Sequence, residues 1–450
     1  MWVISLCRGR AIVWAMLGST RYNTGSSPSS VIPMTQLWTW KRLALFNLCL
    51  KPEEVNYTRL KSAMDYQAGG SMPGQPLGWL EHHTMAWSPE AISSDSYVVD
   101  IGLLGAREVE EGLRSFKELE LDGHEINRHN FHLPTLSARL GQACHEVHRG
   151  RGFVIIRGID PLKYSVEDNV MIYLGIAAYI GEQRGFQDKK GNMLTHITAS
   201  KDWKTPPELR HGIHTNSSLM WHCDMGVDIL ALHVRSLAER GGDTFIASSF
   251  TIVKELKFLY PHVIQALQEV AWPIQVSGNP VPRYILAPLL HIDSGNNLII
   301  LSVDPGRLGV HPSTMGTDGT SPIPPLDPTQ LEALRVLNQV ASKYRLRLDT
   351  KPGDMVFLNN FTHLHARDAY SDPGQGQGRH LVRLYLRNPT MADPVPKPMR
   401  VPWEAAFGPR VTEERYPVVP ALEYSAPRYT AGSAAFPLDD NDDANGNSAA

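Results

Sequence analysis

A histidine and an aspartate separated by one residue stand near the middle of the chain, in the segment Trp221-His222-Cys223-Asp224. Side chains two positions apart in an extended strand point to the same face, so one metal ion can take both. A single His-x-Asp is a weak signal, because chance produces one in many chains of this length. By the same alternation, we expect Cys223 and Trp221 to point away from the metal and into the core.

A strand later in the chain strengthens this interpretation. Residues 353–368 contain a turn followed by a strand that ends in a histidine, His365, about 140 residues after the first pair. Two histidines and one carboxylate form the triad of non-haem Fe(II) oxygenases, which leaves three coordination positions for co-substrate and O₂. We therefore expect His222, Asp224 and His365 to bind Fe(II). His363 shares the strand face with His365 and competes with it as a ligand.

A 2-oxo acid that chelates such a metal also needs a cation for its remote carboxylate. Arginine serves best, because its guanidinium forms a bidentate, charge-assisted pair with a carboxylate. The strand after His365 offers two candidates, Arg379 and Arg383. The segment Gly241-Gly242-Asp243-Thr244, some twenty residues after the first histidine, adds the hydroxyl donor of Thr244 after a tight turn.

In this order and spacing, the motifs resemble the taurine dioxygenase and clavaminate synthase-like (TauD/TfdA) family of Fe(II)/2-oxoglutarate-dependent oxygenases, over about residues 152–388. The resemblance implies a double-stranded β-helix (jelly roll) core with flanking and inserted helices. It also implies site roles: iron ligands His222, Asp224 and His365 rather than His363, and 2-oxoglutarate held by Thr244 and Arg379, with Arg383 close by. An extra loop at residues 372–378 loosens the alignment, so Arg379 and Arg383 can exchange roles. For the same reason the family's substrate-binding arginine is not carried over.

The resemblance implies a dioxygenase that hydroxylates, or otherwise oxidises, a small organic molecule and releases succinate and CO₂. Relatives that halogenate lack the carboxylate, so Asp224 favours oxygen chemistry. Two alternatives stay open. A cupin-like metal-dependent hydrolase or isomerase would use the triad without Arg379 or Thr244, and a binding protein could keep the fold without turnover. The sequence pattern does not identify the substrate.

Four other histidines are weaker candidates. His145 and His148 are spaced i, i+3 on an expected helix but lack the HExxH spacing, so we expect them on the surface. His211 and His214 lie in a loop before His222. They either line the pocket or make polar loop contacts without a functional role.

The elements that position these residues indicate an α+β fold. Helical patterns cover residues 101–119 and 136–150, a strand follows at 152–158, and Ser165 precedes a further helix. Many short strands beyond Asn216 indicate a sandwich or barrel. These expected strands are Ile229 to Val234, Thr244 to Ala247, Tyr284 to Leu290, Leu298 to Val303, Arg345 to Leu348, Met355 to Leu358 and Leu381 to Leu386. Two helical insertions, Phe250 to Tyr260 closed by Pro261 and a second opened by Asp327-Pro328, should pack outside the sheets.

The composition is that of an ordinary globular protein, with 42% hydrophobic residues, 20% charged residues and a net charge of −3. No charge field points to nucleic acid or to an anionic membrane, so we expect a small-molecule substrate and neither of those partners. The oligomeric state stays open. Four cysteines without a CxxC pair fit neither a disulfide framework nor a structural zinc site, which indicates a reducing compartment.

We expect four regions: an N-terminal extension (1–78), a helical region packing on the core (79–150), the oxygenase domain (151–410) and a C-terminal extension (411–450) with an acidic, disordered tail. No acidic residue precedes Glu53, and this basic, Ser-containing segment has the composition of a transit peptide. The alternatives are a disordered extension, or a true start nearer Met64 or Met72. We therefore expect a cytoplasmic protein, or a mitochondrial one if the segment is a targeting signal.

Overall fold

The computed structural model describes residues 78–207, 210–277, 283–310, 319–373, 378–409 and 413–423, and two short strands nearer the N-terminus. Contacts divide the chain into two units, Met1–Gly74 and Gln75–Ala450. In the first unit, β1 (Leu6–Cys7) pairs antiparallel with β2 (Arg10–Ala11). The predicted targeting segment at the N-terminus and the predicted acidic tail lie outside the described residues. Within the described part, no helix is long and apolar enough to cross a membrane.

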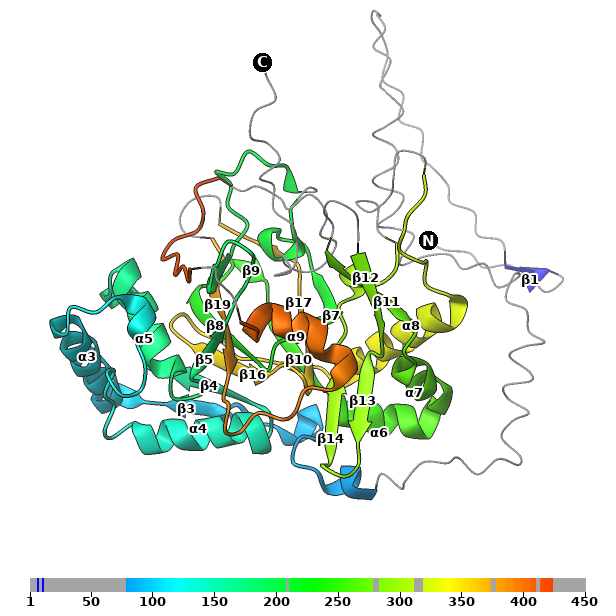
Figure 1. Ribbon diagram of the computed structural model, residues 1–450, viewed down its shortest axis with the longest axis horizontal. Helices are drawn as coiled ribbons and strands as arrows, with labels where there is room; N and C mark the ends of the chain where they lie inside the picture. The colour runs from blue at the N-terminus through cyan, green and yellow to red at the C-terminus, as the bar shows by residue number, and fades with distance from the viewer. Residues whose placement is uncertain are drawn as a thin grey trace, which may run out of the picture. The chain divides into compact units, whose positions relative to one another are not determined.

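The larger sheet of the second unit has seven strands in the order β3-β4-β16-β8-β19-β5, with β6 also paired to β19 (Figure 1). All of its pairs are antiparallel except β3 with β4. Its strands are β3 (Val98–Asp100), β4 (Phe153–Arg157), β5 (Gln183–Gly185), β6 (Leu194–Ile197), β8 (Ile229–Ser236), β16 (Met355–Asn359) and β19 (His380–Arg387).

The smaller sheet has four antiparallel strands in the order β15-β10-β17-β7. They are β7 (Leu219–His222), β10 (Thr244–Ser248), β15 (Leu346–Arg347) and β17 (His363–Arg367). Alternate residues of β8, such as Leu230 and Leu232, share a buried cluster with Ile246 of β10. The two sheets therefore face each other across an apolar interior, as the sandwich or barrel expected from the short-strand pattern requires.

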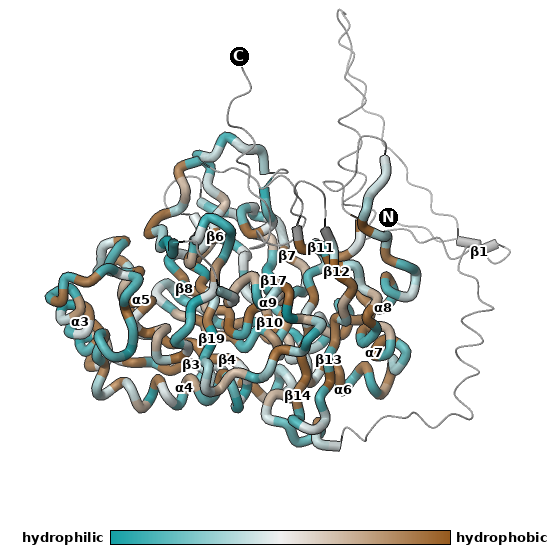
Figure 2. The backbone as a smooth tube through the Cα atoms, in the orientation of Figure 1, coloured by the Kyte–Doolittle hydropathy of each residue, from teal (hydrophilic) through white to brown (hydrophobic). Residues whose placement is uncertain are grey.

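Helices α3 (Gly102–Glu118), α4 (Ser137–Arg149) and α5 (Val166–Ala177) cover the outer face of the larger sheet (Figure 1). Ile229 and Ala231, the other alternate residues of β8, lie in the same buried cluster as the inward-facing residues of these three helices. The predicted helix ends are confirmed: Gly150 caps α4, and Ser165 Oγ accepts a hydrogen bond from the Asp168 N–H at 3.0 Å at the start of α5. In Figure 2 hydrophobic stretches follow the strands, while colours alternate along these helices.

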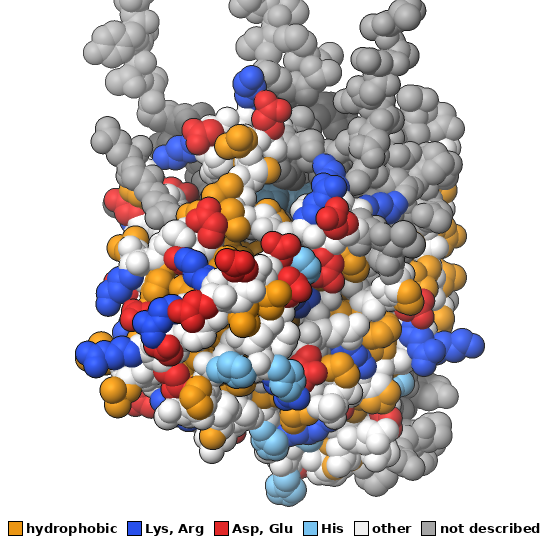
Figure 3. Space-filling model, turned by 60° about the vertical axis from the view of Figure 1, so that its left-hand side comes forward, with side chains coloured by type: hydrophobic (Ala, Val, Ile, Leu, Met, Phe, Trp, Pro, Cys, Tyr) orange, Lys and Arg blue, Asp and Glu red, His pale blue; other side chains and the backbone are white. Residues whose placement is uncertain are grey.

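The outer side of this helical layer faces solvent. Figure 3, which brings this side forward, shows Lys and Arg side chains interspersed with Asp and Glu. His145 of α4 is exposed, as predicted. The surface prediction is wrong for His148, which is 4% exposed and has its Nδ1 2.8 Å from the Cys144 carbonyl oxygen. His148 continues the buried stripe of α4 at helix spacing after Cys144, so the stripe is wider than its apolar residues alone suggest.

A second helical layer covers the outer face of the smaller sheet, as predicted for the two insertions. It consists of α6 (Ser249–Leu259), α7 (Pro261–Gln268) and α8 (Pro328–Lys343), and α8 begins with the capping box of Asp327 and Gln330. Trp221 and Cys223 lie in the cluster under this layer, so both point into the core as predicted. Two hairpins join the layer: β11 (Trp272–Ser277) with β12 (Arg283–Ala287), and β13 (Leu290–Asp293) with β14 (Leu298–Leu301).

Two expectations at prolines need correction. Pro261 closes α6 but also begins α7, because a proline suits the first turn of a helix, where its missing N–H is not needed. The strand expected from Tyr284 to Leu290 is two strands, β12 and β13. Pro288 lies between them and cannot donate to a sheet. Three further elements were not predicted from the sequence: β9 (Arg240–Gly241), β18 (Tyr370–Ser371) and α9 (Arg400–Phe407).

His233 generates a prediction about stability in acid. It is buried in β8, 5.2 Å from the Tyr173 ring, and neither of its nitrogens has a hydrogen-bond partner among the described residues. Burial, aided by Arg235, lowers the pKa of His233 to about 3, so the folded protein keeps it neutral. An unfolded histidine takes up a proton near pH 6.5, so protonation favours the unfolded state below that pH. The contribution of neutral His233 to the free energy of unfolding is therefore fully present above pH 6.5 and is lost as the pH falls, at up to about 1.4 kcal/mol per pH unit.

We therefore expect His233→Leu to reduce the loss of stability between about pH 6.5 and pH 5. The measurement is the free energy of unfolding from urea titrations across that range. The exposed His145→Leu variant is the control and should retain the parent's pH dependence. Identical pH dependence in the parent and His233→Leu would contradict the assignment.

Candidate active site

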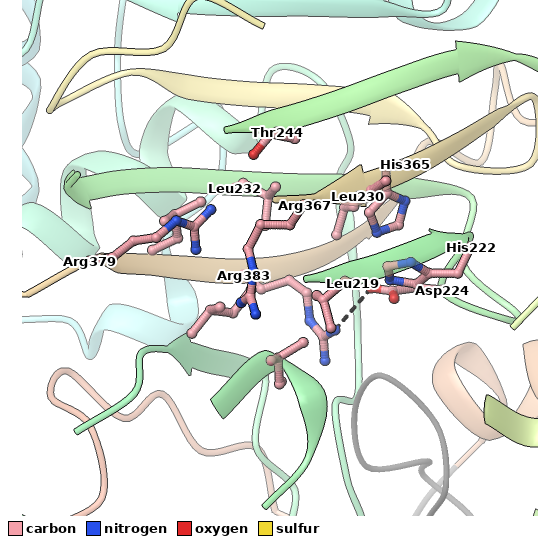
Figure 4. Close-up of a pocket in the computed structure, with 14 residues that line it drawn as sticks. Leu219, His222, Asp224, Leu230, Leu232, Thr244, His365, Arg367, Arg379 and Arg383 are labelled. Atoms are coloured by element: carbon pink, nitrogen blue, oxygen red, sulfur yellow. Dashed lines mark hydrogen bonds and ion pairs between the residues drawn. The ribbon is translucent and has the colours of Figure 1, made fainter. Parts of the chain in front are cut away.

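Strand β17 brings the predicted site residues together, because it lies between β10 and β7. Its His365 pairs with His222 of β7 on one side, and its Arg367 pairs with Thr244 of β10 on the other. The rings of His222 and His365 lie 4.2 Å apart. His222, Asp224 and His365 each offer one ligand atom, and these atoms lie within 4.8 Å of one another. Figure 4 shows the three side chains converging at one end of a pocket.

The surroundings of both histidines suit metal ligation. His222 Nδ1 lies 2.7 Å from the Met220 carbonyl oxygen, so it carries the proton and leaves Nε2 with its lone pair for a metal. Burial, together with the nearby His222, lowers the pKa of His365 to about 3, which keeps His365 uncharged at neutral pH. Metal ligation requires this neutral form.

Asp224 lies two residues after the end of β7 and is held through its backbone by Asn360. The Asp224 N–H donates to Asn360 Oδ1 at 3.0 Å, and Asn360 Nδ2 donates to the Asp224 carbonyl at 2.7 Å and the Val227 carbonyl at 2.8 Å. One buried amide therefore ties together both sides of the turn that presents the carboxylate.

The Asp224 carboxylate forms an ion pair with Arg383, whose Nη1 lies 3.0 Å from Oδ2. Arg383 Nε donates to Gln187 Oε1 at 2.9 Å, which fixes the guanidinium. Burial acts to raise the pKa of Asp224, but the nearby charges, chiefly that of Arg383, outweigh it, and the pKa lies below its usual value. An ionised carboxylate beside two neutral imidazoles is the donor set that suits Fe(II), so these residues fit the expected metal.

Arg379 reaches the pocket across the Gly241-Gly242 turn. Its Nε donates to the Gly242 carbonyl at 3.1 Å, and a Cβ on Gly242 would come within 2.9 Å of its side chain. Both glycines have positive φ, 72° and 73°, which other residues rarely adopt. The two glycines are therefore required for this approach, which places Thr244 and Arg379 in the same wall.

All six predicted site residues line one pocket: His222, Asp224, Thr244, His365, Arg379 and Arg383. The rest of its lining is mainly aliphatic, with Ile197, Ile213, Leu219, Leu230, Leu232, Ala366 and Leu381. Arg367 also lines the pocket, but no role was predicted for it from the sequence. The same holds for Gln187 and Asn360, which contact the site residues. Alternation along β17 could have found Arg367, because it stands two residues after His365. Gln187 and Asn360 carry no comparable signal, since their partners are far away in the sequence.

The other candidate histidines lie elsewhere. His363 points into the interior, where its ring stacks 5.7 Å from that of Trp87, and it is not among the residues that line the pocket. His211 and His214, on either side of a short 3-10 turn, are also outside the lining defined by the described residues. Burial lowers the pKa of both, which favours their neutral forms.

Comparisons with known proteins agree with this geometry. Residues 115–385 match the model of the taurine catabolism dioxygenase TauD, TfdA family. The taurine hydroxylase-like protein SAT17 of Stachybotrys chartarum is 31% identical over 339 residues, which cover 74% of this chain and 86% of that protein. The FR-33289 synthase of Streptomyces rubellomurinus is 24% identical over 66% of this chain and 86% of its own length.

A solved structure shows the same fold. It is an asparagine oxygenase in complex with Fe(II), 2S,3S-3-hydroxyasparagine and succinate, with a TM-score of 0.51 and 16% identity over 65% of this chain and 93% of that chain. The predicted jelly-roll core with flanking helices is thereby confirmed.

The triad geometry predicts the effect of ligand substitutions. His222→Gln and Asp224→Asn should each weaken Fe(II) binding by on the order of a hundredfold or more, because three protein ligands are the minimum set of such a site. Anaerobic metal titration measures the affinity, and thermal unfolding checks the fold. His363→Gln, on the same strand, should keep the parent's affinity. Loss of iron in His363→Gln alone would contradict the assignment.

Asn360 should control metal affinity without touching the metal. In Asn360→Ala the Asp224 turn loses three hydrogen bonds, so we expect about ten- to hundredfold weaker Fe(II) binding, as is typical when a group that orients a metal ligand is removed. Asn359→Ala is the matched control, because Asn359 is also buried but donates to the Val147 carbonyl away from the site. Equal effects of the two substitutions on metal affinity would argue that Asn360 acts only on overall stability.

Proposed function

The chain belongs to the taurine catabolism dioxygenase TauD, TfdA family, and we propose that it oxidises a small organic molecule with Fe(II), 2-oxoglutarate and O₂. In this proposal His222, Asp224 and His365 hold the iron, and Arg379 with Thr244 holds 2-oxoglutarate. The observation that carries this proposal is that the metal triad shares one pocket with a wall that contains Thr244 and Arg379, which we call the arginine wall. Fe(II), when bound, supplies the O₂ chemistry that oxidises 2-oxoglutarate to succinate and CO₂ and transfers oxygen to the substrate.

We assign the carboxylate anchor to Arg379 and not to Arg383. Arg383 is already paired with Asp224 and Gln187, so moving it to a co-substrate would leave a buried carboxylate without its cation. Arg379 is 3% exposed, and its Nη1 has no partner among the described residues. A buried guanidinium with an unused donor is suited to an anionic ligand.

The remaining lining residues exclude water and position the substrate. Leu230 and Leu232 of β8 and Leu381 of β19 line the same pocket from the larger sheet. An apolar wall of this kind lowers the local dielectric and holds a substrate C–H bond close to the metal. Hydroxylation of a small molecule is therefore the outcome we propose.

Two further points of the proposal concern location and alternatives. Cys144 and Cys223 are free and buried, in keeping with a reducing compartment such as the cytoplasm. A metal-dependent hydrolase or isomerase would need neither Arg379 nor Thr244. Succinate formation that requires 2-oxoglutarate, Fe(II) and O₂ together distinguishes the dioxygenase from both.

The two arginines should separate kinetically. Arg379→Ala should raise the KM for 2-oxoglutarate on the order of thirtyfold or more, because a partly dry carboxylate that loses its cation costs about 2–5 kcal/mol. Arg383→Ala should instead weaken Fe(II) binding, because it leaves Asp224 without its partner. The measurement is succinate formation across a range of 2-oxoglutarate concentrations with Fe(II) saturating, and across a range of Fe(II) concentrations with 2-oxoglutarate saturating. The reverse order would make Arg383 the anchor.

A further inference from the structure

Four polar atoms without hydrogen-bond partners among the described residues gather on one side of the pocket. They are Arg367 Nε and Nη1, Arg379 Nη1 and the Tyr370 hydroxyl. The guanidinium carbons of Arg367 and Arg379 lie 5.1 and 5.5 Å from the centre of the same Tyr370 ring. Both arginines line the pocket and both are buried, at 5% and 3% exposure (Figure 4). The unused donors therefore form a local group.

The orientation of Arg367 is fixed by the chain around it. It ends β17, two residues after His365, and pairs with Thr244 of β10. Its Nη2 donates to the carbonyls of three loop residues: Gly212 at 3.2 Å, Thr215 at 2.9 Å, and Ser217. These bonds hold one corner of the guanidinium and leave the Nε and Nη1 donors without a protein partner.

Two buried cations in contact with one ring are costly unless an anion joins them. Within the described part of the chain, neither Arg367 nor Arg379 forms an ion pair with a carboxylate. Burial, together with the charge of Arg367, lowers the pKa of Arg379 to about 10. The charges thus repel each other in the absence of a ligand.

We propose that Arg367 is a second co-substrate-binding residue, and that Arg367 and Arg379 together hold the remote carboxylate of 2-oxoglutarate. A carboxylate has two oxygens with about four acceptor positions, enough for donors from two guanidiniums and from the Thr244 or Tyr370 hydroxyl. The Tyr370 ring contacts both guanidiniums. This inference rests on the proposed function and extends it to a residue outside the predicted set.

The test compares two 2-oxo acids. Both 2-oxoglutarate and 2-oxopentanoate carry the group that chelates the metal, but 2-oxopentanoate lacks the remote carboxylate. Their dissociation constants are measured by anaerobic calorimetry on the Fe(II)-loaded full-length protein. Arg367→Gln should weaken binding of 2-oxoglutarate at least tenfold, about 1.4 kcal/mol, and leave binding of 2-oxopentanoate unchanged. Arg367→Lys, which keeps the charge, should show a smaller loss.

Arg210→Gln is the matched control, because Arg210 also donates to three loop carbonyls, those of Ser200, Trp203 and Thr205, but does not line the pocket. It should leave the affinities for both acids unchanged. An equal loss for both acids in Arg367→Gln would reduce Arg367 to a loop anchor. Unchanged 2-oxoglutarate binding in Arg367→Gln would assign the free donors to another anion, such as one on the substrate. Either result overturns the inference about Arg367 but leaves the proposed function standing. A parent protein that does not bind 2-oxoglutarate would overturn the proposed function as well.

Discussion

The register of β17 is the constraint on which the site depends. This strand is hydrogen-bonded on both sides, to β7 and to β10, so His365 has His222 as its neighbour on one side and lies on the same strand face as Arg367, opposite Thr244. A slip of one residue would turn His365 and Arg367 away from the pocket and into the helical layer. The cluster around Leu364, which packs outward under α6 and α8, opposes such a slip. Core packing and site geometry are therefore set by the same strand.

Charge within the pocket is arranged in two groups. Near the metal ligands, Asp224 and Arg383 compensate each other, and Gln187 and Asn360 hold this pair in place. At the other end, Arg367 and Arg379 have no carboxylate partner among the described residues. At the metal end, positive and negative side chains of the protein thus balance each other. At the other end, the two arginines are complementary to an anionic ligand. Aliphatic residues make up most of the remaining lining of the pocket.

Sequence alone predicted what local patterns encode. Capping and alternation predicted the helix caps at Ser165 and Asp327, the short strands, and the direction of Cys223 away from the metal. The structure has all of these features. Sequence alone did not predict the order of strands in the sheets, because pairings such as β16 with β4 join segments about 200 residues apart. Buried polar contacts were missed for the same reason. Asn360 meets Asp224 only after both sheets have formed, and a polar residue such as His148 shows its burial only once α4 has packed.

The central claim is that the metal triad and the arginine wall form one site, and thermodynamic coupling tests it most directly. Under anaerobic conditions, 2-oxoglutarate is titrated into the protein with and without Fe(II), and Fe(II) with and without 2-oxoglutarate. If both bind in one pocket and contact each other, each must raise the affinity of the other by the same factor. We predict such a mutual increase of at least tenfold. Affinities for 2-oxoglutarate that do not depend on the metal would contradict the account.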